Sequence, residues 1–103
     1  MNQTIVRYKV KPDRAAENVE LVRAVYDELE RTQPAGLRYA TFQLDDGLTF
    51  THVAVNETDS PRSPLNEVAA FQEFTREIAD RCEEQPQATE VRQVGAYRFF
   101  DEG

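Results

Sequence analysis

The sequence predicts an α+β fold in which a four-stranded antiparallel sheet carries two helices on one face. Three observations support this fold class. Four short runs alternate apolar and polar residues, which is typical of strands. Two longer runs repeat their apolar residues with the period of a helix. The runs follow one another in the order β-α-β-β-α-β, separated by proline, glycine and aspartate.

The length and charge of the chain limit the classes of function. Its 103 residues suffice for one domain with a modest core, expected to span residues 1–103. The net charge of −7 disfavours nucleic acid and anionic membranes as partners. No apolar run approaches the ~20 residues that cross a bilayer, and no signal peptide begins the chain, so we expect a cytoplasmic protein. The single cysteine, Cys82, excludes an intramolecular disulfide.

The first strand is predicted at residues 4–11 and the first helix at residues 14–31. Along the strand, one face consists of Val6, Tyr8 and Val10. Asp13 is placed to cap the helix, because its carboxylate can accept the free backbone N–H groups of the first turn. The apolar stripe of the helix consists of Val19, Val22, Tyr26 and Leu29, flanked by Leu21 and Val25.

A β-hairpin is predicted next, with strands at residues 37–44 and 48–56. Asp-Gly between two alternating runs indicates a type I′ turn, which needs positive φ at both central residues. With Asp46 and Gly47 at those positions, His52 lies opposite Thr41. One face of the hairpin then consists of Leu37, Tyr39, Thr41, Phe50, His52 and Ala54. The other consists of Ala40, Phe42, Leu44, Val53 and Val55.

The second helix is predicted at residues 65–84 and the fourth strand at residues 88–100. Ser63 and Pro64 suit an N-cap followed by proline at the first helical position. The apolar stripe of this helix consists of Leu65, Val68, Phe71, Thr75, Ile78 and Cys82, with Phe74 beside it. Pro86 is expected to end the helix.

This order of elements is the ferredoxin-like arrangement, whose sheet has one face free of helices. Neither face of the predicted hairpin is polar, however. A monomer seldom exposes such a patch, so we expect a second copy to pack sheet against sheet in a twofold-symmetric homodimer. We assign the face that bears Tyr39 and His52 to this interface. The face that bears Val53 and Val55 is assigned to the helices.

A resemblance to a known family is carried by three segments and by the order of elements. The segments are VRYKVKPD, GLRYATFQLDDG and AAFQEF. The chain resembles the dimeric α+β-barrel superfamily, and within it the antibiotic-biosynthesis-monooxygenase-type domains, over nearly its whole length. The resemblance implies a homodimer whose two sheets form a shared barrel, with a ligand cavity between sheet and helices in each subunit. It implies activities that range from cofactor-free oxygenation of polyketide-like phenols to quinol oxidation and haem degradation.

The chain departs from this family's pattern in its second helix and third strand. Many members follow Ala-Phe by two residues and then histidine or tryptophan. Ala70 and Phe71 match the start of that pattern, but Phe74 stands at its end. A strand position that is often tryptophan corresponds to Asn56 here. Because the haem-degrading branch uses a tryptophan and a helix histidine, and this chain has neither, haem degradation is not expected.

The candidate catalytic residues are His52, Tyr8, Arg7 and Arg38. His52, the only histidine, could act as a general base or as a donor to a phenolate, with Thr41, Gln43 or Tyr39 fixing its tautomer. The alternative is a histidine packed in the dimer interface. Tyr8 could orient an aromatic substrate or simply fill the core. The two arginines could bind a ligand anion or form cross-strand ion pairs.

A substrate pocket is expected to be lined by Phe42, Phe71, Phe74, Tyr39 and Asn66. The structural alternative is core filling for the aromatic residues and a helix-terminus role for Asn66. No glycine-rich phosphate loop and no convergent set of metal-binding carboxylates is present, so no cofactor is predicted.

The predicted function is a cofactor-independent, monooxygenase-like enzyme that acts on a small aromatic molecule. The alternatives are a non-catalytic dimeric protein that binds a small ligand or assists another protein, and a relative with a filled core and no site. A cavity of about 300 Å³ or more between sheet and helices would favour a ligand site. A space filled by Phe42, Phe71 and Phe74 would rule out the enzyme.

Overall fold

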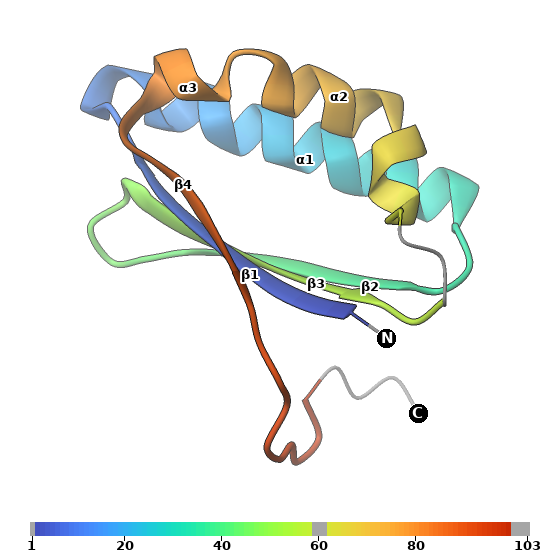
Figure 1. The fold of residues 1–103 in the computed structure, drawn as a ribbon. Helices are drawn as coiled ribbons and strands as arrows, with labels where there is room; N and C mark the ends of the chain where they lie inside the picture. The colour runs from blue at the N-terminus through green and yellow to red at the C-terminus, as the bar shows by residue number, and fades with distance from the viewer. Residues whose placement is uncertain (1, 59–61, 100–103) are drawn as a thin grey trace.

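The computed structural model describes residues 2–58 and 62–99. A twisted sheet lies beneath a layer of helices that cover one of its faces (Figure 1). The strands are β1 (Asn2–Val10), β2 (Leu37–Gln43), β3 (Thr49–Asn56) and β4 (Cys82–Glu90). The helices are α1 (Ala15–Thr32), α2 (Ala69–Arg76) and α3 (Ile78–Arg81), with short 3-10 helices η1 (Pro12–Arg14) and η2 (Pro64–Glu67). The strand order β2-β3-β1-β4, antiparallel throughout, confirms the predicted ferredoxin-like fold.

The β2–β3 hairpin has the predicted register, because Thr41 pairs with His52. Its turn has a different geometry. Gly47 has a φ of +71°, but Asp46 is not among the described residues with positive φ, so the predicted type I′ turn is wrong. The Asp46 carboxylate instead accepts hydrogen bonds from Thr49 Oγ1 at 2.6 Å and from the backbone nitrogens of Thr49 and Leu48 at 2.8 Å. These bonds, chiefly those from Thr49, lower the pKa of Asp46 to about 2.

The segment after the hairpin is helical over a shorter range than predicted. Residues 64–81 form η2, α2 and α3, and the chain enters β4 at Cys82 rather than at residue 88. Pairing with β1 explains the early start, since the Lys11 nitrogen donates to the Arg81 oxygen at 2.9 Å and Val10 pairs with Cys82. Pro86 does not end a helix. It lies in β4, where a register shift accommodates its missing N–H.

The ends predicted for the helices and for the last strand also differ in part from the structure. Asp13 lies in η1 and makes no capping hydrogen bond to α1. Ser63 does cap, accepting from the Leu65 nitrogen at 3.2 Å. Residues 91–99 belong to no strand, and Figure 1 shows this segment below the sheet, away from the helices.

The sheet turns the opposite face toward the helices from the one predicted for the hairpin. Tyr8, Phe50 and His52 face the helices and are 1%, 2% and 4% exposed. Because Tyr8 pairs with Phe50 across β1 and β3, their side chains share a face, and His52 lies two residues along β3 on that same face. The assignment of His52 to a dimer interface, and of Val53 and Val55 to the helices, is therefore wrong.

The core lies between the sheet and the helices. Its buried members are Tyr8, Val10, Val25, Phe50, Leu65, Phe74 and Cys82. The helices are also joined by Glu28 of α1, whose carboxylate accepts from the backbone nitrogens of Ala69 and Ala70 at 3.2 and 2.8 Å. Within the described residues, none of the helices has the length and apolar character to cross a membrane.

Candidate functional site

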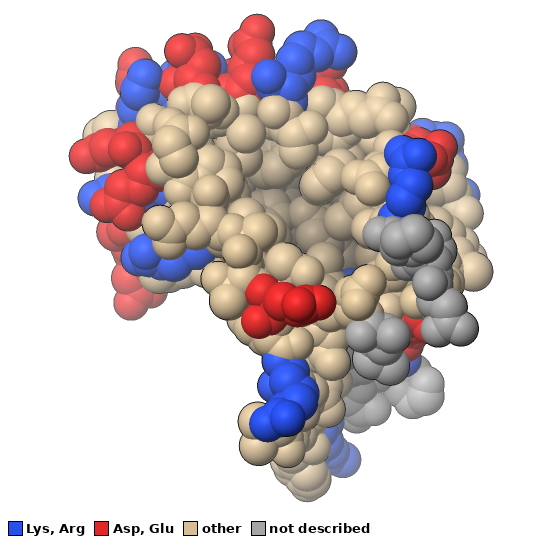
Figure 2. Space-filling view, viewed as in Figure 1, with Lys and Arg blue, Asp and Glu red and all other residues tan. Residues whose placement is uncertain are grey.

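A cavity of about 320 Å³ lies between the sheet and the helices and opens on the face of the molecule shown in Figure 2. We refer to it as the pocket. We call residues 64–81, which form η2, α2 and α3, the second helical segment. The residues that line the pocket come from every strand, from Ser63 and from this segment: Thr4, Val6, Tyr8, Tyr39, His52, Ala54, Ser63, Leu65, Asn66, Phe71, Phe74, Thr75, Ile78 and Pro86. None of these residues is Lys, Arg, Asp or Glu. The walls are therefore largely aromatic and aliphatic, with a few uncharged polar groups.

The pocket brings together most of the residues expected at a site. His52, Tyr8, Tyr39, Phe71, Phe74 and Asn66 all line it. Phe42, Arg7 and Arg38 do not, because alternation along β1 and β2 directs their side chains to the other face of the sheet. Phe42 is 46% exposed there. Arg38 pairs with Glu57 at 2.8 Å, the cross-strand alternative considered for it.

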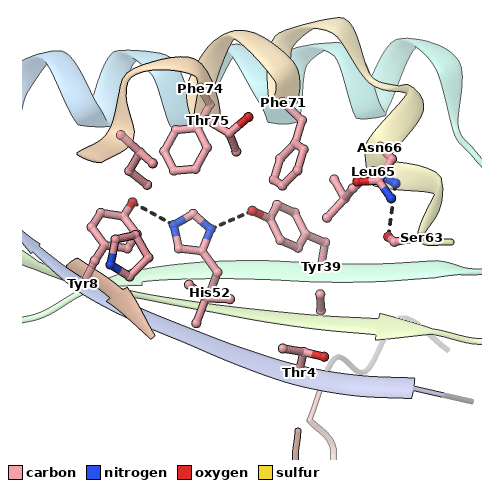
Figure 3. Close-up of a pocket in the computed structure, with 14 residues that line it drawn as sticks. Thr4, Tyr8, Tyr39, His52, Ser63, Leu65, Asn66, Phe71, Phe74 and Thr75 are labelled. Atoms are coloured by element: carbon pink, nitrogen blue, oxygen red, sulfur yellow. Dashed lines mark hydrogen bonds between the residues drawn. The ribbon is translucent and has the colours of Figure 1, made fainter. Parts of the chain in front are cut away.

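His52 is held at the base of the pocket by hydrogen bonds to both of its ring nitrogens (Figure 3). Nε2 lies 2.8 Å from Tyr8 Oη, and Nδ1 lies 2.6 Å from Tyr39 Oη. Thr41 Oγ1 is 3.1 Å from Nδ1. Gln43, the third partner considered, instead donates to the Gly47 oxygen. Burial lowers the pKa of His52 to about 4, so the imidazole is neutral at pH 7.

The hydrogen bonds continue from Tyr8 away from the pocket. Asn18 Nδ2 donates to Tyr8 Oη at 2.9 Å, and Arg81 Nε donates to Asn18 Oδ1 at 3.1 Å. Arg81 also donates to the Phe74 oxygen at 2.7 Å, and its guanidinium lies 5.2 Å from the centre of the Phe74 ring. We call the series Arg81, Asn18, Tyr8, His52 and Tyr39 the buried hydrogen-bond chain.

Asn18 and Arg81 were missed by the sequence analysis. Asn18 is 0% exposed and Arg81 is 1% exposed. Among the residues that the structure describes, no carboxylate lies within ion-pair distance of Arg81. A signal for both was present. Asn18 stands on the apolar stripe of α1, four residues before Val22, and Arg81 stands three residues after Ile78 on the stripe of the second helical segment. A polar residue on an apolar stripe indicates a buried polar contact.

Aromatic rings pack closely around His52 and Tyr39. Tyr39 stacks on Tyr26 at a centroid distance of 5.4 Å and meets Phe71 edge-on at 6.4 Å. His52 lies 5.4 Å from the centre of Phe74. Burial raises the pKa of Tyr8 and of Tyr39, so both phenols keep their protons at neutral pH and act as hydrogen-bond donors. The arrangement suits a flat, uncharged ligand with one polar edge.

Metal ligands are not gathered in the described part of the chain, where no group of three or more His, Cys, Asp or Glu lies together. The one cysteine, Cys82, is buried in the core as expected, and burial raises the pKa of its thiol.

Comparison with known proteins finds solved structures that share this fold. No protein-family model and no curated protein matches the chain. A structure named "Putative antibiotic biosynthesis monooxygenase" from Nitrosomonas europaea aligns with a TM-score of 0.73 and 21% identity, over 90% of this chain and 89% of that one. The fold is that of the antibiotic biosynthesis monooxygenase-like structures.

Two further solved structures agree with this assignment of the fold. One named "antibiotic biosynthesis monooxygenase" aligns with a TM-score of 0.68 and 18% identity, over 92% of this chain and 100% of that one. PA3566 from Pseudomonas aeruginosa aligns with a TM-score of 0.72 and 17% identity, over 91% and 94%. The structural resemblance expected from the sequence is confirmed, and at these identities it concerns the fold.

Proposed function

We propose that the protein is a cofactor-independent, monooxygenase-like enzyme that binds a small, electron-rich aromatic molecule in the pocket. The observation that carries the proposal is the cavity of about 320 Å³ with aromatic walls around the neutral, hydrogen-bonded His52. Phe42 lies outside the cavity, and Phe71 and Phe74 line it without filling it. The printed names of two structures with this fold, "Putative antibiotic biosynthesis monooxygenase" and "antibiotic biosynthesis monooxygenase", support the same activity.

The proposed reaction oxidises a phenol to a quinone with molecular oxygen. One oxygen atom replaces hydrogen on the ring carbon opposite the hydroxyl and becomes a carbonyl. The other leaves as water with the two hydrogens that the substrate loses. The substrate supplies all four electrons, so the reaction needs no external reductant. The contribution of the pocket is to orient the ring, exclude water from it and stabilise charge on the substrate oxygen with the hydroxyl of Tyr39.

Haem degradation, which the resemblance seen in the sequence also implies, does not fit the pocket. Both nitrogens of His52 are engaged by Tyr8 and Tyr39, which leaves no free lone pair for iron.

Oxygen consumption with 1-naphthol tests the proposal, because conversion to 1,4-naphthoquinone takes up one O₂ per molecule and changes the absorbance. Ala54→Phe, which places a large side chain in the pocket, should abolish turnover. Ala24→Phe on the exposed side of α1 is the matched control and should leave turnover unchanged. Turnover that survives in Ala54→Phe would place the reaction elsewhere.

A non-catalytic binding protein is the second candidate. It is favoured by one observation: no lining residue offers a free base, since both His52 nitrogens are hydrogen-bonded. Binding of 1-naphthol that is blocked by Ala54→Phe, without oxygen uptake, would support this candidate. Absence of binding to the wild-type protein would contradict both candidates.

A homodimer through the sheet is proposed as the assembled state. The face opposite the pocket carries Ile5, Phe42, Val53 and Val55, and the adjacent segment 91–99 exposes Val94, Tyr97 and Phe99. A second copy would cover this apolar surface. Light scattering at micromolar concentration should give twice the chain mass, and Val53→Arg should give the monomer. A monomeric wild-type mass would contradict the proposal. The cytoplasmic location remains a prediction.

A further inference from the structure

We infer that Tyr39 donates its hydroxyl proton to a carbonyl-type oxygen of the bound aromatic molecule, and that the rest of the buried hydrogen-bond chain holds His52 in the tautomer that frees this proton. Tyr39 is thereby the residue that selects the ligand, and Asn18 and Arg81 are positioning residues. The inference rests on the proposed function, since the ligand is the molecule that occupies the pocket.

Arg81 determines which atoms donate and which accept along the buried hydrogen-bond chain. A guanidinium has donors and no acceptor, so Arg81 Nε must donate to Asn18, and the atom that accepts must be Oδ1. This fixes the orientation of the Asn18 amide, whose Nδ2 then points to Tyr8 Oη at 2.9 Å. Tyr8 is therefore an acceptor toward Asn18.

Tyr8 must donate its own proton to His52. Among the described residues, Tyr8 Oη has two hydrogen-bond partners, Asn18 and His52 Nε2, and Asn18 is already the donor. Tyr8 is 1% exposed, so a proton directed elsewhere would be left unpaired in the core. His52 Nε2 accepts, which places the ring proton of the neutral imidazole on Nδ1. The low pKa of His52 agrees with a ring that carries one proton.

Tyr39 is the acceptor for that Nδ1 proton. Its Oη lies 2.6 Å from Nδ1, closer than Thr41 Oγ1 at 3.1 Å. The proton of Tyr39 therefore cannot point to His52. Thr41 Oγ1 also lies within hydrogen-bond reach of Tyr39. When Tyr26 donates to Thr41 Oγ1 across 2.7 Å, the Thr41 hydroxyl has its own proton to donate to Tyr39 and does not need the Tyr39 proton. The Tyr39 proton is thus available to a molecule in the pocket that Tyr39 lines (Figure 3).

The class of ligand follows from this single directed donor. A carboxylate or phosphate in the pocket would find no cationic side chain among the lining residues and would be buried unpaired. A pure hydrocarbon would leave the Tyr39 proton without an acceptor. An uncharged aromatic molecule with a ketone, quinone or phenolic oxygen at one edge satisfies both conditions.

Binding of two matched probes tests the role of Tyr39. The probes are 1-tetralone, which has a carbonyl oxygen, and tetralin, which lacks it. Tyr39→Phe should weaken 1-tetralone about tenfold, the value of one hydrogen bond of about 1.4 kcal/mol, and leave tetralin within about twofold. Tyr97→Phe, which removes an exposed phenol from segment 91–99, is the control and should change neither affinity.

The outcomes separate this inference from the proposed function. If both probes bind and Tyr39→Phe weakens neither, Tyr39 is not the donor, the inference is overturned, and the pocket still stands as a binding site. If neither probe binds the wild-type protein, the pocket is not an aromatic site, and the inference falls together with the proposed function.

The positioning part has its own measurement, because His52 is the only histidine and gives one imidazole signal set in a protein labelled with ¹⁵N-histidine. Long-range ¹H–¹⁵N correlations above neutral pH should show the proton on Nδ1. Asn18→Asp should move it to Nε2, since a carboxylate accepts from both Arg81 and Tyr8 and so turns the Tyr8 proton away from His52. Tyr39 would then donate to Nδ1, and the affinity for 1-tetralone should fall about tenfold although Tyr39 itself is unchanged.

If Asn18 only supported the packing of α1, the Asn18→Asp substitution would leave the His52 ring proton on Nδ1. A wild-type spectrum with the proton on Nε2 overturns the assignment of the chain without need of any variant. An Asn18→Asp protein that keeps the proton on Nδ1 shows that Asn18 does not position His52.

Discussion

The face of the sheet toward the helices and the face away from them are both rich in apolar residues, yet only the first holds the buried hydrogen-bond chain. Phe50, on the inner face, is 2% exposed, whereas Phe42, on the neighbouring strand and the outer face, is 46% exposed. The inner face also buries the Tyr8 hydroxyl and His52, although the hairpin face that bears His52 was predicted to be the outer one. Polar residues on a sheet face therefore indicate burial when they have partners, and hydrophobic content alone does not assign a face.

The largest contrast between the two faces is expected from the two phenylalanines. Phe50→Ala should lower the free energy of unfolding by about 4 kcal/mol, because it opens a cavity in the core. Phe42→Ala should change it by less than about 1 kcal/mol in the monomer, because Phe42 is 46% exposed and its loss opens no enclosed cavity. Urea unfolding at low protein concentration measures both. Equal losses would mean that the two faces are buried alike.

A second contrast is expected in the response to acid. Below pH 6.5 an unfolded histidine takes up a proton, whereas buried His52, with a pKa of about 4, does not. The unfolded state therefore binds more protons, and stability present at pH 7 is lost as the pH falls from 6.5 to 4, by about 3 kcal/mol in full. His52→Gln should remove this loss between pH 6.5 and 4.5, where carboxylates still contribute little. An unchanged pH profile in that variant would show that His52 is accessible to protons in the folded state.

A smaller contrast should separate buried from exposed arginines. Arg81→Met keeps a long side chain but removes hydrogen bonds to Asn18 and to the Phe74 oxygen, and we expect a loss of about 2 kcal/mol. Arg76→Met breaks an exposed pair with Glu73 on the same helical segment and should change stability by less than about 0.5 kcal/mol. Thermal unfolding of the two variants side by side measures the difference. Similar losses of stability in the two variants would show that the buried hydrogen bonds of Arg81 do not stabilise the fold.

The smallest effect is expected at Glu28. Glu28→Ala removes the acceptor for two backbone N–H groups at the start of α2 and should cost about 1 kcal/mol, as the loss of a helix cap does. Glu20→Ala, on an exposed side of α1, is the control and should be neutral within about 0.5 kcal/mol. An equal response of the two variants would show that the contact does not stabilise α2.

The sequence predicts those features that depend on local patterns. Alternation and helical period identify the order of elements, and the Asp-Gly position predicts the register that pairs Thr41 with His52. The inward face of the hairpin depends on the pairing of β1 with β3, a contact between distant segments that no local pattern reports. Only with that pairing do Tyr8 and His52 fall on one side of the sheet.

The remaining differences have equally specific causes. The start of β4 was missed because its residues are mostly polar and exposed, and because a proline at position 86 is typical of the residue that follows a helix. Asn18 and Arg81 stand on the apolar stripes of their helices, which signals burial but does not identify the buried partner. Their partners come from other elements, so their role is visible only when α1, β1 and the second helical segment meet.

The helices above the pocket differ in length, and this bears on how a ligand could reach His52. α1 has 18 residues, whereas α2 has 8 and α3 has 4. Helices this short have little stability of their own in water, and their persistence depends on contacts such as those of Glu28. Amide hydrogens of α2 should therefore exchange with solvent through local openings of low free energy, well before those of β1 and β3. A molecule bound against Phe71 and Phe74 would slow that exchange. The exchange rate of the α2 amides would therefore report whether the pocket is occupied.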